Sequence, residues 1–346
     1  MELEGIDLTS MRSMVIRFPE LLVAKKPDSQ FLERARRAGK SGIKGICLVG
    51  MGGSSIAGEM CRGLLLDQSS MPILMVRNYG MPNAVGKKWA VVVVSYSGDT
   101  EETLASFEEA RSRAATIFVV TTGGTLAERS QSLSTHMVPK GLQPRAALPL
   151  LFSAVHPTVE ALLAHETTDL EEMSRSLGQQ AQNWRTRADP PSAMAEKLMG
   201  LMPLFIGWKH LVPVAYRAKC QINENAKAAA FHSELPEADH NEIEAAVSYR
   251  KHSVIPVFLR SCFEESSITK RFDVTSEVLS EAGCGSIHLR IKANSALEES
   301  LAMTHYLDMT SVELAERLGV DPLKVDRIAD LKKKLAAYRS HLSPLS

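Results

Sequence analysis

The sequence predicts an α/β protein with two units, each a parallel β-sheet flanked by helices. Three observations support this class. The chain has 346 residues, more than a single hydrophobic core usually serves. Short, continuously apolar runs alternate with longer helical patterns in the first half, which is typical of parallel strands covered on both faces. The same alternation returns, less regularly, after a polar stretch in the middle of the chain.

The first unit is expected over residues 1–156 and is expected to contain a phosphate site. Its predicted strands are Ile46–Val49, Pro72–Val76, Ala90–Val94 and Ile117–Val120. Helical patterns follow the first and third of these strands, and the second helix is expected over Thr100–Ala115. The turns that precede the two helices therefore lie at the carboxyl edge of one sheet, where ligands bind in such folds.

Residues 157–191 are expected to form an inter-domain helix and linker, because they are mostly polar and end in two prolines. The second unit is expected over residues 192–346. Its predicted strands are Pro203–Gly207, Ser253–Leu259 and Ser286–Ile291, and its predicted helices are Val212–Ala229, Leu297–Leu318 and Leu323–Tyr338.

The amino-acid composition limits the kinds of molecule that the protein is expected to bind. Forty Lys and Arg residues balance 40 Asp and Glu residues, and this zero net charge argues against general binding of nucleic acid or acidic membranes. No apolar run approaches the ~20 residues that span a bilayer. The five cysteines are widely spaced without a CxxC pair, so a reducing cytoplasm is expected. No HxH or HxxxH spacing is present, and no metal is expected.

A glycine-rich turn, GMGGSS, joins the first predicted strand to a helix. Gly52 and Gly53 allow a ligand to approach the backbone closely, and the helix N-terminus presents free N–H groups to an anion. The turn lacks the third glycine of the dinucleotide fingerprint, because position 55 is serine. An NADP site that uses Arg77 and a packing turn without a ligand remain alternatives.

A second turn, SYSGDTEET, follows a strand of four valines. It places three hydroxyls and exposed N–H groups at the start of a helix, which suits a phosphate dianion, and its Asp99 and Glu102 are a candidate capping box. Two such turns on neighbouring strands are more specific than either alone. The residues predicted to bind the phosphate are Gly52, Gly53, Ser54, Ser95, Ser97 and Thr100.

The two turns resemble those of the sugar isomerase (SIS) domain. Together with NENAK (residues 223–227) and HNEIEA (residues 240–245), they resemble the bifunctional phosphoglucose/phosphomannose isomerases of archaea and some bacteria. The resemblance extends from about residue 49 to residue 334 and includes GLQPR, which ends at Arg145. It implies two SIS-type domains, a homodimer, a hexose 6-phosphate substrate, and neither a cofactor nor a metal.

The resemblance also implies an activity and a role for four residues. The activity is the interconversion of glucose 6-phosphate and fructose 6-phosphate, and of mannose 6-phosphate, through a cis-enediol. Glu224 matches the family's catalytic base, and Arg145 matches the residue that stabilises the enediolate. His240 matches the residue that opens the sugar ring, which the neighbouring subunit supplies in relatives. Lys332 is the best match to a lysine that takes part in proton transfer near the C-terminus.

Each of these residues also has an ordinary structural interpretation. Glu224 is then an exposed helix carboxylate, and His240 is a surface salt-bridge partner or a helix cap. Arg145 is a solvated loop arginine, and Lys332 complements the dipole at a helix end. The alternative for the whole protein is a non-catalytic SIS regulator that binds a sugar phosphate. Such a regulator needs the serine-containing turn but neither the glutamate nor the histidine. Relatives commonly carry Thr-Pro-Val after the GVDP motif, where this chain has Leu323-Lys324-Val325.

Overall fold

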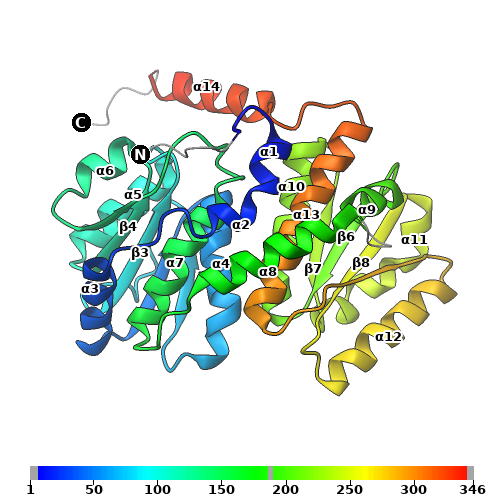
Figure 1. Cartoon of the computed structure of the whole chain (residues 1–346), viewed down its shortest axis with the longest axis horizontal. Helices are drawn as coiled ribbons and strands as arrows, with labels where there is room; N and C mark the ends of the chain where they lie inside the picture. The colour runs from blue at the N-terminus through cyan, green and yellow to red at the C-terminus, as the bar shows by residue number, and fades with distance from the viewer. Residues whose placement is uncertain (1–6, 186–189, 341–346) are drawn as a thin grey trace.

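The computed structural model describes residues 7–185 and 190–340, and it contains two parallel β-sheets flanked by helices (Figure 1). The first sheet has the strand order β2-β1-β3-β4-β5 and the second has the order β7-β6-β8-β9. The predicted α/β class is therefore confirmed. The strands are β1 (Gly45–Val49), β2 (Ile73–Val76), β3 (Trp89–Ser95), β4 (Thr116–Thr121), β5 (Ser134–Met137), β6 (Met202–Gly207), β7 (Phe231–Glu234), β8 (Val254–Arg260) and β9 (Ile287–Arg290).

Helices cover both faces of each sheet. Those of the N-terminal part are α1 (Met11–Ile16), α2 (Phe18–Leu21), α3 (Ser29–Lys40), α4 (Gly53–Leu65), α5 (Glu101–Ser112), α6 (Gly124–Arg129), α7 (Leu148–Leu162) and α8 (Leu170–Gln182). The C-terminal part adds α9 (Pro191–Lys197), α10 (Val212–Gln221), α11 (Ala246–Lys251), α12 (Ser266–Glu281), α13 (Ala296–Arg317) and α14 (Asp326–Ser340). Short 3₁₀ turns lie at Leu66–Gln68, Asn183–Arg185, Lys209–Leu211, Glu237–His240 and Glu242–Ala245.

The central strands β1 and β3 of the first sheet are buried at every position because both faces of the sheet are covered. In β1, Ile46 and Leu48 belong to the cluster that contains α3, α4 and α7. The alternate residues Cys47 and Val49 belong to the cluster on the opposite face, with α5 and α6. This two-sided burial explains why the strand could be recognised as a continuous apolar run.

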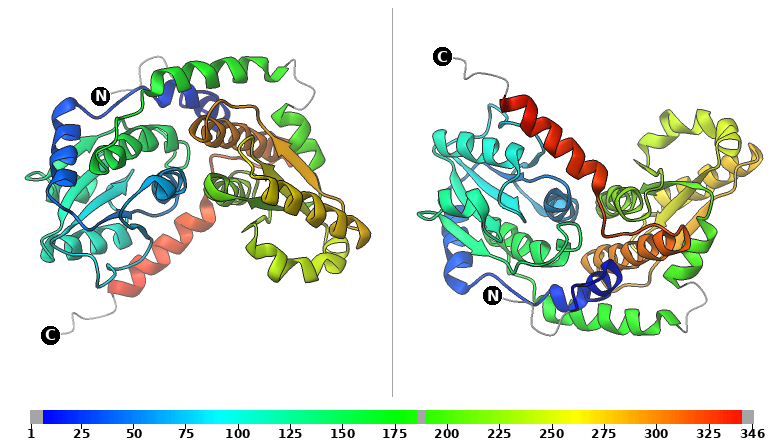
Figure 2. Two further views of the ribbon diagram at one scale, coloured as in Figure 1. Left: turned by 90° about the horizontal axis from the view of Figure 1, so that it is seen from below. Right: turned by 90° about the horizontal axis from the view of Figure 1, so that it is seen from above.

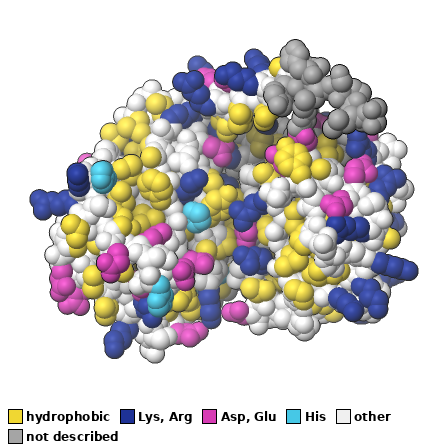
Figure 3. All heavy atoms as spheres, turned by 180° about the vertical axis from the view of Figure 1, so that it is seen from behind, with side chains coloured by type: hydrophobic (Ala, Val, Ile, Leu, Met, Phe, Trp, Pro, Cys, Tyr) yellow, Lys and Arg dark blue, Asp and Glu magenta, His cyan; other side chains and the backbone are white. Residues whose placement is uncertain are grey.

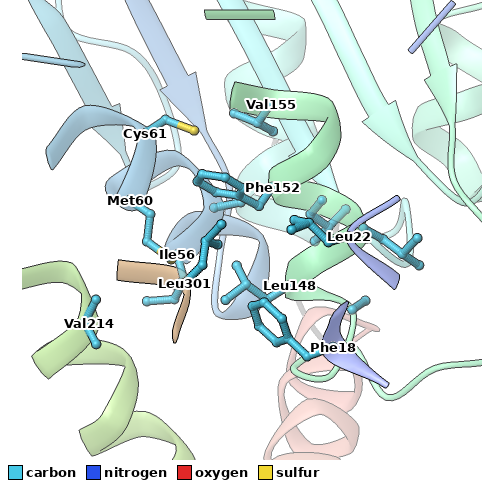
Figure 4. Close-up of a cluster of buried hydrophobic side chains, with 14 of the residues drawn as sticks. Phe18, Leu22, Ile56, Met60, Cys61, Leu148, Phe152, Val155, Val214 and Leu301 are labelled. Atoms are coloured by element: carbon cyan, nitrogen blue, oxygen red, sulfur yellow. The ribbon is translucent and has the colours of Figure 1, made fainter. Parts of the chain in front are cut away.

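The two units share one hydrophobic core rather than meeting at a polar interface. Figure 4 shows Met60 of α4 and Phe152 of α7, from the first unit, close to Leu301 of α13 and Val214 of α10, from the second. The 22-residue helix α13 is buried along most of its length and also contacts the N-terminal helix α1. The spacing between the two units is therefore set by packed side chains.

Several elements differ from the prediction. The helix predicted over Val212–Ala229 ends as an α-helix at Gln221 and continues as a π-helical turn, Ile222–Ala226. Helix α7 runs to Leu162 and so crosses position 156, where the first unit was predicted to end. The edge strands β5 and β7 were not predicted. Their side chains are mostly not buried, so neither strand forms a continuous apolar run.

Helix α14 differs from the other long helices in its exposure. Its residues 326–335 are all exposed, including the apolar side chains Ile328, Leu331 and Leu335. Figure 2 shows it extending past the first unit as a separate arm. Within residues 7–185 and 190–340, no helix is both long and apolar enough to span a membrane.

Candidate functional site

The two predicted phosphate turns lie side by side, because β1 and β3 are adjacent parallel strands. Helix α4 begins within the first turn, at Gly53, and α5 begins within the second, at Glu101. The two turns are also joined by a hydrogen bond, since the backbone N–H of Tyr96 donates to Oγ of Ser54 at 3.2 Å. Two helix N-termini therefore point toward one edge of the sheet, and both favour an anion there.

The glycine turn is in close contact with the GLQPR segment. A Cβ atom added to Gly53 would lie 2.9 Å from the carbonyl oxygen of Pro144 and 3.2 Å from Cα of Arg145. Only a residue without a side chain leaves the two backbones at this distance. Arg145 is thereby held beside the N-terminus of α4, next to the expected phosphate.

The serine-containing turn is tightened by its own hydroxyls. The buried Ser95 accepts a hydrogen bond from the N–H of Gly98 at 3.1 Å and lies 3.4 Å from the hydroxyl of Thr100. Ser97 is exposed, and its Oγ accepts from the N–H of Asp99 at 3.3 Å. Thr100 is the N-cap of α5, yet its side chain makes no cap hydrogen bond. The hydroxyls of Ser97 and Thr100 are thus placed where a ligand can reach them.

The candidate capping box is not formed. The carboxylate of Asp99 instead accepts hydrogen bonds from the N–H and the hydroxyl of Thr125, both at 2.9 Å. These bonds lower the pKa of Asp99. The turn points Asp99 toward α6 because Gly98 has φ +79, and a Cβ there would lie 1.8 Å from the carbonyl oxygen of Gly123.

Arg145 is buried and bridges the two units. Its Nε donates to Oδ1 of Asn225 at 2.7 Å, and its Nη2 donates to the carbonyl oxygens of Pro322 and, at 3.3 Å, of Leu323. Its Nη1 has only long contacts, 3.5 Å to Gln143 and 3.9 Å to the carboxylate of Glu224. Burial lowers the pKa of Arg145, and the charge of Glu224 acts in the opposite direction.

Glu224 lies in the π-helical turn of the NENAK motif, directly before Asn225. Its side chain is 30% exposed, so that the carboxylate faces Arg145 on one side and solvent on the other. The neighbouring Asn225 is fully buried and donates from Nδ2 to Oγ of Ser311 on α13 at 2.9 Å. The turn is therefore anchored to the shared core while its carboxylate stays accessible.

A buried ion pair between Arg217 and Asp308 contacts the backbone of Arg145. Arg217 of α10 contacts both carboxylate oxygens of Asp308, with Nη2 at 2.6 Å from Oδ2. The same Nη2 donates to the backbone carbonyl of Arg145 at 2.8 Å. Breaking a buried pair of this kind is strongly destabilising, so the backbone of Arg145 is firmly placed.

His240 and Lys332 do not join this cluster within one chain. His240 is exposed at the end of a 3₁₀ turn, and the adjacent Asp239 fixes that turn to α12 through Arg271, at 2.9 Å, and Thr275. Lys332 is exposed on α14. In the part of the chain that the structure describes, no hydrogen bond or ion pair connects either residue to Glu224.

Arg77, the residue required by an NADP site, is already engaged. It forms an ion pair with Glu59, and its guanidinium lies 5.0 Å from the ring centroid of Tyr216. These groups line a cavity of about 270 Å³ between α4 and α10. Figure 3 shows the molecular surface hollowed between the two units, with charged and histidine side chains around it. Among the described residues, no group of three His, Cys, Asp or Glu side chains is arranged to hold a metal.

The residues that hold Arg145 and Asn225 in place could not be identified from the sequence. Asn225 was visible only as part of a motif, and Ser311 and the carbonyls of Pro322 and Leu323 carried no signal of their own. The acceptors of Arg145 in the second unit lie 80 and more positions away in the chain. The sequence feature that could have indicated these contacts is the presence of both the NENAK and the GVDP motifs, which contain Asn225 and Pro322.

The chain resembles known proteins over most of its length. The family model of the bacterial phospho-glucose isomerase C-terminal SIS domain matches residues 187–335. A bifunctional phosphoglucose/phosphomannose isomerase from Aquifex aeolicus is 34% identical, with 85% of this chain and 91% of the relative covered. A D-glucosamine-6-phosphate 4-epimerase from Sulfolobus acidocaldarius is 35% identical over 62% of this chain and 68% of its own length.

Solved structures agree on the fold. The C-terminal domain of glucosamine-fructose-6-phosphate aminotransferase from Francisella tularensis superposes with a TM-score of 0.70 at 15% identity, covering 90% of this chain and 98% of that one. Two parallel sheets of SIS type and 34% sequence identity over 85% of the chain point to one family. The chain belongs to the family of bifunctional phosphoglucose/phosphomannose isomerases.

Proposed function

We propose that this chain is an isomerase that interconverts glucose 6-phosphate, fructose 6-phosphate and mannose 6-phosphate through a cis-enediol. The observation that carries the proposal is the placement of the Glu224 carboxylate 3.9 Å from Nη1 of Arg145, whose backbone packs against Gly53 at the N-terminus of α4. The relatives' names supply the substrate class. A non-catalytic regulator would not need an accessible carboxylate at this point.

The phosphate group is held by the two turns of the first unit. The N–H groups at the start of α4, near Gly52 and Gly53, and those at the start of α5 would bind its oxygens together with the hydroxyls of Ser97 and Thr100. Ser54 and Ser95, both buried, hold the turns in shape. The phosphate thus fixes one end of the opened sugar.

Glu224 acts as the base at the other end of the sugar. Its carboxylate takes the proton from C2 of the aldose, and the electron pair forms the C1–C2 double bond of an enediolate. The proton of the 2-hydroxyl then passes to the oxygen on C1, and return of the abstracted proton to C1 gives the ketose. Rotation about the C2–C3 bond turns the other face of C2 toward Glu224, and return of the proton to C2 then gives the epimeric aldose. Arg145 presents Nη1, the nitrogen with only long contacts, to the negative oxygen that develops.

Ring opening requires an acid and a base at the ring oxygen and the anomeric hydroxyl. His240 suits this role chemically, because an imidazole exchanges a proton near neutral pH. Since His240 is exposed and, among the described residues, makes no hydrogen bond or ion pair with Glu224, we assign it to the site of a second copy in a homodimer. Lys332 lies on the exposed helix α14, and we assign it to the same interface on the ground of that exposure.

An assay of the purified, chelator-treated protein tests the proposal. Fructose 6-phosphate is supplied, and the formation of glucose 6-phosphate and mannose 6-phosphate is followed separately. Glucosamine 6-phosphate serves as a further substrate, to detect epimerisation at C4. Turnover of fructose 6-phosphate is expected; binding of hexose phosphates without turnover would favour the regulator, and turnover of glucosamine 6-phosphate alone would replace the substrate assignment.

A further inference from the structure

Lys227, the last residue of NENAK, is bonded in an unusual way. Its Nζ donates to the carbonyl oxygens of Glu224 at 2.7 Å, Asp321 at 2.8 Å and Lys324 at 2.7 Å, with Asn225 at 3.3 Å. All four partners are backbone carbonyls, and none is a carboxylate. An exposed lysine usually extends into solvent, because ordering its side chain costs conformational entropy.

The four carbonyls belong to two separate segments. Glu224 and Asn225 lie in the catalytic turn, whereas Asp321 and Lys324 lie in the strap, which we define as residues 318–325 between α13 and α14. Lys227 has φ +55, a left-handed conformation that is uncommon for a residue with a side chain. Backbone strain of this kind persists only where surrounding contacts maintain it.

The same strap also receives Arg145. The carbonyl oxygens of four consecutive residues, 321–324, accept hydrogen bonds from two cations: Lys227 binds the outer two, and Arg145 binds those of Pro322 and Leu323. The strap is therefore a shared ligand of both side chains. Burial and the nearby charge of Arg145 lower the pKa of Lys227, and the carboxylates of Asp321 and Glu224 act in the opposite direction.

We propose that Lys227 is a positioning residue that clamps the strap onto the catalytic turn and so fixes the Glu224–Arg145 pair for proton transfer. This inference rests on the proposed function for its catalytic consequence, but the clamp itself is a structural claim. Within residues 7–185 and 190–340, the hydrogen bonds of the Lys227 ammonium all go to backbone carbonyls. Its proposed effect on the chemistry therefore acts through the placement of Glu224 and Arg145.

Replacement of Lys227 by Met removes the ammonium and retains a long apolar side chain. We expect kcat to fall at least about tenfold, because displacement of catalytic groups by about 1 Å can cost on the order of 100-fold. The inhibition constant of inorganic phosphate should stay within about twofold, since the phosphate turns belong to the first unit. Lys227→Arg retains the charge and should recover part of the lost kcat. Lys251→Met, at the exposed end of α11, is the matched control.

Hydrogen–deuterium exchange of the ligand-free protein tests the clamp without relying on activity. Peptides covering residues 318–325 should exchange faster in Lys227→Met, and peptides covering residues 95–100 should be unchanged. Unchanged exchange in the strap would refute the clamp, and a loosened strap with unchanged kcat would refute the positioning role. A parallel loss of phosphate inhibition would show general damage and overturn the assignment. If the wild-type protein turns over none of the hexose phosphates, both the proposed function and the positioning role of Lys227 are wrong. The exchange rates of the strap then still show whether Lys227 holds it in place.

Discussion

Arg145 and Glu224 belong to different units of the fold, and their side chains lie 3.9 Å apart. Arg145 is 4% exposed and Glu224 is 30% exposed. A buried guanidinium held by Asn225 and the strap provides a fixed positive charge, whereas the carboxylate retains access to a ligand. This difference suits a stationary electrostatic group beside a base that must touch substrate.

Replacing the carboxylate of Glu224 by an amide should abolish proton transfer and leave binding intact. We expect Glu224→Gln to lower kcat by about 100-fold to 10,000-fold, the usual contribution of a general base. Inhibition by inorganic phosphate should be unchanged. Glu277→Gln, on the exposed surface of α12, is the control. An active Glu224→Gln protein would place the base elsewhere.

The phosphate turn should not tolerate a side chain at position 98. Gly98 has φ +79 and no room for a Cβ beside Gly123, so Gly98→Ala must distort the turn that carries Ser97 and Thr100. We expect the KM for fructose 6-phosphate to rise at least about tenfold, because phosphate binding orients the whole substrate. Gly285→Ala, where the added Cβ meets nothing within 4 Å, is the control. Equal KM values for the two variants would contradict this role of the turn.

The proposed dimer can be tested by complementation. If His240 acts in the partner's site, a mixed dimer of Glu224→Gln and His240→Ala chains has one site with both native residues and one site with neither. Random mixing then restores about a quarter of wild-type activity. The two variants are unfolded or dissociated together, reassembled and assayed. An inactive mixture of two inactive variants would place His240 and Glu224 on the same chain, and an active His240→Ala protein would place His240 outside the site.

His305 should make the protein less stable in acid. It is buried between Phe18 and Trp184, and burial lowers its pKa from 6.5 to about 3. Between these values the unfolded chain binds a proton that the folded chain does not, so stability is complete above about pH 6.5 and falls as the pH decreases toward 3. The loss of Tm between about pH 7.5 and about pH 5 should be smaller in His305→Gln than in wild type or in His252→Gln, whose histidine is exposed. An identical loss in all three proteins would exclude His305 as the cause.

The sequence was sufficient for the strands with strong apolar runs and insufficient for the edges of the sheets. The valines of β3 are buried on both faces, so they could be recognised without tertiary information. Strand β7 is an edge strand with mostly exposed side chains, and its residues look like a loop. Helix α7 is buried on all sides, which removes the polar face that reveals an amphipathic helix.

The same limit applies to the site. Glycines and hydroxyls beside strand ends carry a local signal, and they indicated the phosphate turns. The π-helical turn of Ile222–Ala226 carries none, because it depends on the left-handed Lys227 and on carbonyls almost 100 positions away. Likewise, nothing in the sequence around His240 indicates that Arg271 and Thr275 of α12 hold the neighbouring Asp239, since these contacts join residues more than 30 positions apart.

The continuous apolar layer formed by α4, α7, α10 and α13 has a consequence for heating. Because this layer joins the two halves of the molecule, neither half can melt without exposing the side chains that support the other. We therefore expect one calorimetric transition, with enzymatic inactivation at the same temperature. The distance between the Glu224 carboxylate and the Arg145 guanidinium is then maintained up to the unfolding temperature of the whole chain.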